Sequence, residues 1–365
     1  MRLPSGVYHQ SYRQDHAWWQ TNFVKLRMLI LLLVLFLVVP LFGGYPLSVA
    51  NRIGYTILGA LGVQVLIGFA GQVTLGHMAF IAIGAYTSAI FVLQVNQSVP
   101  ALTQAGLAYP ISVVLAMFAA GVWSVLFGLP SARVKGFYLI MTTMAAQFVT
   151  VDFFITHYVS RIGGRGMSFS LPPGSISVGP WNIRTDLDQY YLMLVFVILS
   201  LVVVGNLMRT RIGRAWIAIR DNDIAAEVLG VNVVRYKLLA FFVAGALAGL
   251  AGAYANSISS VVSPEQFTFG ESLWLVGVVL IGGIGSNYGT VFGAIYLELI
   301  VILLQPVINA ALPPDIREYV ALRIAHVKDV IFGLSICLFL LLEPKGLAYR
   351  WQQIKNYIHL WPFSY

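Results

Sequence analysis

The chain has 365 residues, of which 59% are hydrophobic and only 10% are charged, and its formal net charge is +8. Soluble domains carry about 25% charged residues, and a soluble protein of this length has too little polar surface to cover so much apolar material. The composition therefore excludes an ordinary soluble domain and indicates an all-α polytopic membrane protein. Since one span needs about 20 apolar residues, we expect about 10 transmembrane helices.

Ten apolar segments follow one another along the chain, and each is expected to form a membrane helix. The eighth is short enough to be a half-helix. We expect a terminal segment at 1–27, a transmembrane domain at 28–345 and a tail at 346–365. The ten segments are Met28–Phe42, Ile53–Phe69, Met78–Leu93, Ala108–Phe127, Phe137–Ile155, Tyr190–Leu207, Leu238–Ile258, Leu273–Ile284, Val291–Val307 and Val327–Leu342.

Basic residues are divided unequally between alternate loops. Ten spans place both termini on one side, and that side then carries 15 of the 22 Lys and Arg residues. Because cytoplasmic loops are enriched in Lys and Arg, we expect cytoplasmic N and C termini. If two short segments formed one span, every later loop would be assigned to the opposite side of the membrane. The seven basic residues assigned outside are Arg52, Arg161, Arg165, Arg184, Arg317, Arg323 and Lys328.

The loop Met208–Lys237 is long, charged and assigned to the cytoplasm. Helix-starting side chains at 221–223 precede the run Ile224–Leu229, and Gly230 is a typical stop, so we expect a short helix across the membrane face. Its two small alanines favour docking into a cleft of another protein, and the alternative is an interfacial helix without a partner. The residues assigned to this coupling helix are Arg220, Asp221, Asp223, Ala225, Ala226, Glu227 and Gly230.

Two further stretches are rich in glycine, at 68–86 and at 282–294. Small residues allow close helix packing in a membrane, and glycine can break a helix where backbone lines a cavity. Polar residues inside the first stretch either line a path through the membrane or bond to neighbouring backbone. We expect close packing or a tight re-entrant turn in the second. The polar residues of the first stretch are Gln72, Thr74 and His77.

Ionisable groups inside spans are costly and often functional. Glu298 lies midway along the ninth segment. It is expected to face the bundle interior, where it either pairs with another polar side chain or takes part in transport. Asp152 lies near the outer end of the fifth segment, and Glu271 begins the eighth at the interface.

Three stretches together resemble the permeases of branched-chain amino-acid ABC importers. They are Ala218–Gly230 (Ala-Ile-Arg-Asp-Asn-Asp-Ile-Ala-Ala-Glu-Val-Leu-Gly), Gly68–Tyr86 and Gly282–Ala294. The resemblance covers about residues 50–345 and is closest to the second of two paralogous permeases. Glu227 follows the alanines, which departs from the simplest form of the importer loop.

The resemblance implies a multi-pass protein of the bacterial inner membrane that works with partners and is not an enzyme. The partners implied are a paralogous permease in a heterodimer, two cytoplasmic ABC ATPases and a periplasmic substrate-binding protein. No Walker A motif is present in the sequence, so ATP is expected on the ATPases and no cofactor in this chain. The chain is expected to lie in a lipid bilayer and not to bind nucleic acid.

Branched-chain amino acids are the implied substrates, and urea, amides and other amino or aromatic acids are alternatives within the family. An ion-coupled secondary transporter would need buried carboxylates or a sodium site, and only Glu298 is a clear candidate. A membrane enzyme would need a metal-spaced cluster or a nucleophile with a base, and the sequence contains neither pattern. The glycine-rich outer loop at Gly163–Gly166 is a candidate contact for the binding protein.

Overall fold

The computed structural model describes residues 22–132, 136–159, 168–172, 174–259, 261–311 and 324–360. The loop glycines Gly163–Gly166 and most of the terminal segment at 1–27 lie outside these ranges. All ten predicted segments are helical, which confirms the all-α class. Within the described ranges, seven helices are long and apolar enough to cross a membrane, and nine if each of two bent helix pairs is one span. The predicted number of ten crossings is therefore not confirmed.

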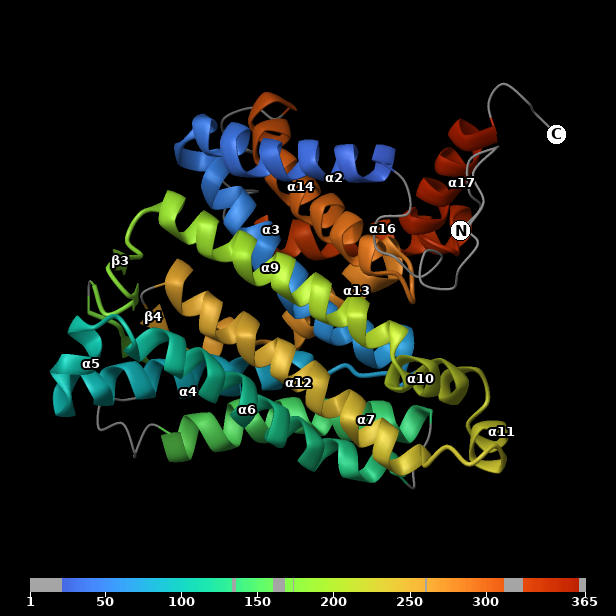
Figure 1. Cartoon of the computed structure of the whole chain (residues 1–365), viewed down its shortest axis with the longest axis horizontal. Coiled ribbons are helices and arrows are strands. Elements are labelled where there is room, and N and C mark those ends of the chain that lie inside the picture. The colour runs from blue at the N-terminus through green and yellow to red at the C-terminus, as the bar shows by residue number, and fades with distance from the viewer. Residues whose placement is uncertain are drawn as a thin grey trace.

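Seven spans run roughly along the long dimension of the molecule (Figure 1). They are α2 with η1 and η2 (Asn22–Leu33, Val34–Val38, Val39–Phe42), α3 with η3 (Gly44–Val63, Gln64–Phe69), α4 (His77–Ser98), α6 (Ala108–Gly128), α7 with η5 (Phe137–Phe148, Val149–Val159), α9 (Asp186–Arg209) and α12 (Val233–Ile258).

The bent pairs follow α12. In the first pair the chain turns by 118° between its two helices, and in the second by 46°. The first consists of η6 and α13 (Pro264–Gln266, Phe269–Gly282) followed by α14 (Asn287–Ala311), and the second of α16 (Ile324–Leu342) followed by α17 (Leu347–Leu360). Helix α2 begins before the predicted boundary at residue 27, and α17 occupies the predicted tail.

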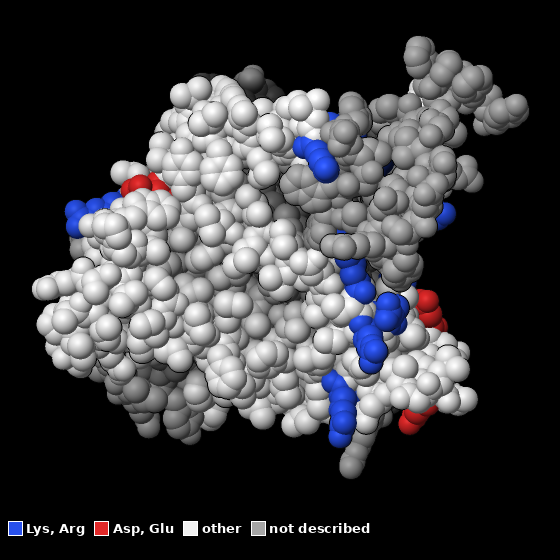
Figure 2. Space-filling view, viewed as in Figure 1, with Lys and Arg blue, Asp and Glu red and all other residues white. Residues whose placement is uncertain are grey.

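Short elements mark the two ends of the bundle (Figure 1). The strands and α5 lie at one end, the strand end, and α10 and α11 lie at the opposite end, the α11 end. Lys and Arg side chains form a band near the α11 end (Figure 2). The short elements are α5 (Pro100–Gln104), η4 (Leu129–Ala132), β1 (Phe169–Ser170), β2 (Ser177–Val178), β3 (Trp181–Asn182), α10 (Arg211–Asp221), α11 (Asp223–Val228) and β4 (Val261–Val262). Strand β1 pairs antiparallel with β4, and β2 with β3.

Helix α12 is the centre of the bundle and packs on α3, α4 and α6. Its glycines bring backbones together: a Cβ on Gly249 would lie 2.4 Å from the Ala116 carbonyl oxygen of α6. A Cβ on Gly84 of α4 would lie 2.5 Å from the Cα of Gly249. Because the hydrophobic effect does not drive helices together within lipid, van der Waals contact at such close approach stabilises the helix packing. Gly249 therefore sits in a seam where three helices meet.

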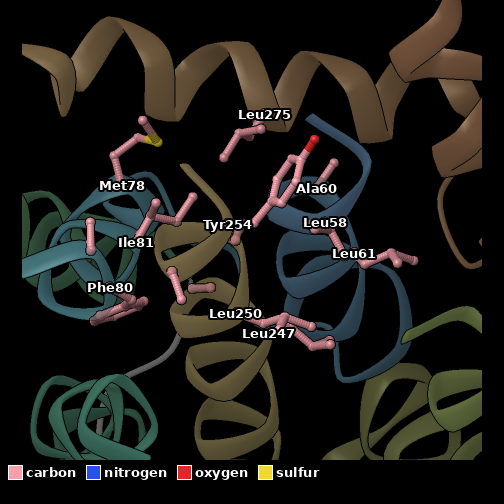
Figure 3. Close-up of a cluster of buried hydrophobic side chains, with 14 of the residues drawn as sticks. Leu58, Ala60, Leu61, Met78, Phe80, Ile81, Leu247, Leu250, Tyr254 and Leu275 are labelled. Carbon is pink, nitrogen blue, oxygen red and sulfur yellow. The ribbon is translucent and has the colours of Figure 1, made fainter. Parts of the chain in front are cut away.

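Larger side chains fill the space beside this seam (Figure 3). Leu250 and Tyr254 of α12 lie between the side chains of α3 and those of α4, and Leu275 of α13 closes the cluster. Leu58 and Ile81, from α3 and α4, are fully buried within it. The central helices α3, α4, α12 and α13 therefore share one apolar core.

The α13–α14 turn confirms the predicted tight turn at the second glycine-rich stretch. Gly283 and Gly285 have φ values of 116° and 83°, a region that side chains disfavour. A Cβ on Gly282 would lie 2.0 Å from the Gly289 carbonyl oxygen. Helix α13 has 14 residues, about 21 Å at 1.5 Å per residue, whereas the hydrocarbon core is about 30 Å thick. The length of α13 therefore favours the half-helix alternative.

We predict that Gly84→Ala destabilises the folded protein, because its Cβ meets the backbone of Gly249 and overpacking costs about 1–3 kcal/mol. The control is Gly333→Ala on α16, where a Cβ meets nothing within 4 Å. The readout is the melting temperature of the purified protein in detergent. Equal melting temperatures for the two variants would contradict the close backbone packing of α4 and α12 at Gly84.

Candidate functional site

Helix α10 is fixed to the bundle by a buried tryptophan. Trp216 is fully buried, and its indole N–H donates a 2.8 Å hydrogen bond to the carbonyl oxygen of Tyr236 in α12. The Thr210 hydroxyl caps the start of α10 by accepting from the Ile212 amide. The cytoplasmic loop expected from the sequence is thus an ordered structure packed on a central helix.

Helix α11 forms where the sequence predicts a short helix. The Asn222 side chain caps it by accepting from the Ala225 amide at 3.1 Å, and Gly230 follows it with a φ of 85°. Ala226 is only 2% exposed, so the expectation that both alanines face a partner is wrong for Ala226. This six-residue helix packs one side on its own chain, and Ala226 lies on that side.

The opposite face of α11 is apolar and open. Val228 and Leu229 are each 82% exposed, and Ile224 is 66% exposed. The prediction rested on the small alanines of this stretch and gave no signal for these larger exposed side chains. Together with exposed Ala225 they form the α11 patch, defined by Ile224, Ala225, Val228 and Leu229.

An ion pair with α12 and the Asn222 cap hold α11 in place. The Lys237 ammonium, which is nearly buried at the base of α12, lies 3.5 Å from the Asp223 carboxylate. Asp221 and Glu227 are exposed. Of the charged residues assigned to the coupling helix, Asp223 therefore has a structural partner in α12.

Arg220, at the end of α10, reaches into the membrane bundle. Its Nη1 donates a 2.7 Å hydrogen bond to the carbonyl oxygen of Gly68, at the end of the α3–η3 span. A Cβ on Gly71 would lie 2.9 Å from the Cγ of Arg220, and a Cβ on Gly285 would lie 3.1 Å from its Nη1. The guanidinium thus lies against both glycine-rich breaks.

The two breaks also contact each other directly. A Cβ on Gly68 would lie 2.8 Å from the amide nitrogen of Gly285. The Gln64 side chain donates to the carbonyl oxygen of Gly283 at 3.3 Å. We call this contact the glycine junction, and define it by Gly68, Gly71, Gly283 and Gly285. Residue patterns placed Arg220 on the docking helix, and gave no signal for its contact with the junction.

The chain between η3 and α4 is non-helical at 70–76 and carries the predicted path residues. Gln72, Thr74 and His77 are all buried. The Gln72 amide donates to the Ala70 carbonyl oxygen, whereas the Thr74 hydroxyl and both His77 ring nitrogens have no hydrogen-bond partner among the described residues. In this conformation the three side chains are enclosed by protein.

Neighbouring helices fix this non-helical segment at its α4 end. The Leu75 amide donates to the Thr143 hydroxyl of α7 at 3.1 Å, and the Met78 amide donates to the Ser272 hydroxyl of α13 at 2.9 Å. Helix α4 therefore starts between α7 and the half-helix α13. Broken helices of this kind occur in membrane proteins where backbone lies inside the protein or lines a cavity.

Glu298 lies buried between α14 and α3, as expected for a paired acid. Its Oε1 accepts a 2.8 Å hydrogen bond from the Thr56 hydroxyl, and its Oε2 lies 3.2 Å from the Arg52 Nε. The expectation of a polar partner is confirmed, and Glu298 is not part of the glycine junction. Across the described residues, no group of three or more His, Cys, Asp and Glu side chains is placed to hold a metal ion.

Comparison with known proteins gives matches over most of the chain. The family model for the permease component of the branched-chain amino acid transport system matches residues 45–340. The LivM permease protein of the high-affinity branched-chain amino acid transport system of Salmonella typhimurium is 31% identical over 313 residues, or 80% of this chain and 67% of that protein. The corresponding BraD protein of Pseudomonas aeruginosa is 26% identical over 304 residues, or 80% of this chain and 90% of that protein.

A shorter match reaches a different importer. The autoinducer 2 import system permease protein LsrC of an Enterobacter species is 38% identical over 112 residues, which is 28% of this chain and 32% of that protein. No solved structure matches this chain.

We predict that Thr56→Val lowers the melting temperature, because it leaves a buried carboxylate oxygen of Glu298 without its donor, at a cost of about 1–3 kcal/mol. The control is Thr142→Val, since the exposed Thr142 hydroxyl bonds only within α7. Transport per folded molecule should be unchanged. A transport defect in Thr56→Val at an unchanged melting temperature would assign Glu298 to transport instead.

Proposed function

The chain belongs to the family of branched-chain amino acid transport permeases, and we propose that it is one of two permease subunits of an importer for these amino acids. It is a multi-pass membrane protein and not an enzyme. The two long relatives, LivM and BraD, are both named for branched-chain amino acid transport, whereas the match to the autoinducer 2 permease covers only 28% of the chain. The longer matches therefore favour branched-chain amino acids over other solutes.

The proposed assembly contains a paralogous permease, two ATPases that bind ATP, and a binding protein that delivers the substrate. The α11 end faces the bacterial cytoplasm, and the strand end faces the periplasm. The band of Lys and Arg near the α11 end supports this orientation (Figure 2), because cytoplasmic segments are enriched in these residues. Helix α17 also lies toward the α11 end (Figure 1), which supports a cytoplasmic C terminus.

The α11 patch is the observation that carries the proposal. It presents three large aliphatic side chains at the end of the bundle where charged residues gather, and apolar side chains exposed together mark a protein contact. Asn222 and the Asp223–Lys237 pair hold the helix that bears it. We assign this patch as the surface that docks into an ATPase.

Arg220 provides the connection from that surface to the membrane path. When ATP binding moves the ATPases, α11 and α10 move with them, and the hydrogen bond from Arg220 to Gly68 transmits the movement to the glycine junction. Glycines at the junction permit the change of backbone angle. Opening there exposes the enclosed side chains of Gln72, Thr74 and His77 to the path, and so alternates access between the two sides.

We predict that the double substitution Val228→Asp with Leu229→Asp abolishes ATPase association and ATP-driven uptake, because it puts charge into an apolar contact. Membrane insertion and the melting temperature stay at the wild-type level, since both side chains are exposed. The measurement is co-purification of the ATPases, with uptake into proteoliposomes.

Ile354→Asp is the control, because Ile354 is also an exposed aliphatic residue but lies on α17. It should leave ATPase association intact. If the double variant keeps its ATPases and transports normally, α11 is not the docking surface.

A further inference from the structure

A cavity of about 590 Å³ lies toward the strand end, next to β1 and β4. Its walls come from the end of α7, from η5, from Ser168 next to β1, and from the η6–α13 segment. Pairing of β1 with β4 joins two of these walls. The volume falls within the range of about 300–1,000 Å³ that is typical of small-molecule sites.

Two carboxylates line this cavity, those of Asp152 and Glu265. In the described part of the chain, neither has a basic side chain within ion-pair distance. Asp152 lies within the apolar span Phe137–His157, where a charged side chain is tolerated when it faces protein or water rather than lipid. Its place in the cavity wall accounts for its presence in that span.

The same cavity has an aromatic wall. The rings of Phe148 and Phe269 stack with centroids 6.0 Å apart, and Phe267 and Val151 also line the cavity. An aliphatic side chain would bury apolar surface against this wall, whereas a bare metal ion bound to the two carboxylates would make no such contact. The lining therefore combines a site for a cation with a site for an apolar group.

Gln147 makes the floor of the cavity rigid. It is buried, its amide donates to the Phe267 carbonyl oxygen at 2.7 Å, and its Oε1 accepts from the Ser272 hydroxyl at 3.2 Å. These bonds tie α7 to the beginning of α13. The same Ser272 hydroxyl accepts from the Met78 amide at the start of α4, so the floor connects directly to the broken segment that carries His77.

The start of α13 adds a site for a negative group. Thr268 and Phe269, the cap and the first residue of this 14-residue helix, line the cavity. The first amide groups of a helix have no intrahelical acceptors and attract anions. Carboxylates, helix amides and aromatic rings thus surround one space.

We propose that this cavity binds the zwitterion of an aliphatic α-amino acid on its way into the path. Asp152 and Glu265 bind the ammonium group, the first turn of α13 binds the carboxylate, and Phe148, Phe267 and Phe269 contact the aliphatic side chain. The inference rests on the proposed function, because it makes the cavity the place where the permease receives the amino acid from the strand end. It assigns to this chain a substrate contact separate from that of the binding protein.

The test uses the assembled permease and ATPase complex in lipid nanodiscs without the binding protein, and equilibrium binding of radiolabelled L-leucine. Asp152→Asn and Glu265→Gln should each weaken binding about tenfold or more, because each removes a charge-assisted hydrogen bond to the ammonium group. Unlabelled 4-methylpentanoate, which lacks the ammonium group, should compete much less well than leucine.

Asp186→Asn is the matched control, because it removes an exposed carboxylate on α9 that does not line the cavity. This variant should bind leucine as the wild type does.

The proposal is overturned if the wild type binds no leucine, or if Asp152→Asn and Glu265→Gln bind it with wild-type affinity. Uptake by the complete importer separates this result from the proposed function. Wild-type ATP-driven uptake of leucine together with unaltered binding by both variants rejects the cavity alone, whereas absence of ATP-driven uptake rejects the proposed function.

Discussion

The close approach of α12 to α4 and α6 is the constraint on which the rest of the structure depends. Gly249 and Gly84 leave no room for a side chain between the helices. Their close contact stabilises the bundle by van der Waals packing, because the hydrophobic effect does not drive helices together within lipid. Helix α4 is thereby held at the centre of the bundle, with its start at His77 deep among its neighbours. The non-helical segment at 70–76 connects η3 to this buried start.

This constraint places the two glycine-rich breaks side by side. Gly68 and Gly285 belong to segments far apart in sequence, yet they meet beneath Arg220. One guanidinium thus lies between a helix at the end of the bundle and two backbone turns inside it. Because a charged donor bonds a backbone oxygen here, the contact depends on the shape of the chain at Gly68. The apolar α11 patch at one end and the cavity at the other are then connected through a single set of packed elements.

The spans could be predicted well from apolar runs, since α6 and α14 both contain the segments expected for them. The number of crossings could not, because hydropathy does not distinguish a full span from a 118° turn after a 14-residue helix. The burial of Ala226 was missed, since composition does not fix which face of a six-residue helix meets its own chain. The cavity was also missed, because Asp152 and Glu265 come together only through the tertiary fold.

The transmission of movement through Arg220 is the central claim, and the number of leucine molecules imported per ATP hydrolysed tests it most directly. Arg214→Gln, an exposed arginine on the same helix, is the control. Arg220→Gln should retain the ATPases and hydrolyse ATP, but import about tenfold less leucine per ATP, while Arg214→Gln matches the wild type. A wild-type ratio for Arg220→Gln in the complete importer would contradict the account.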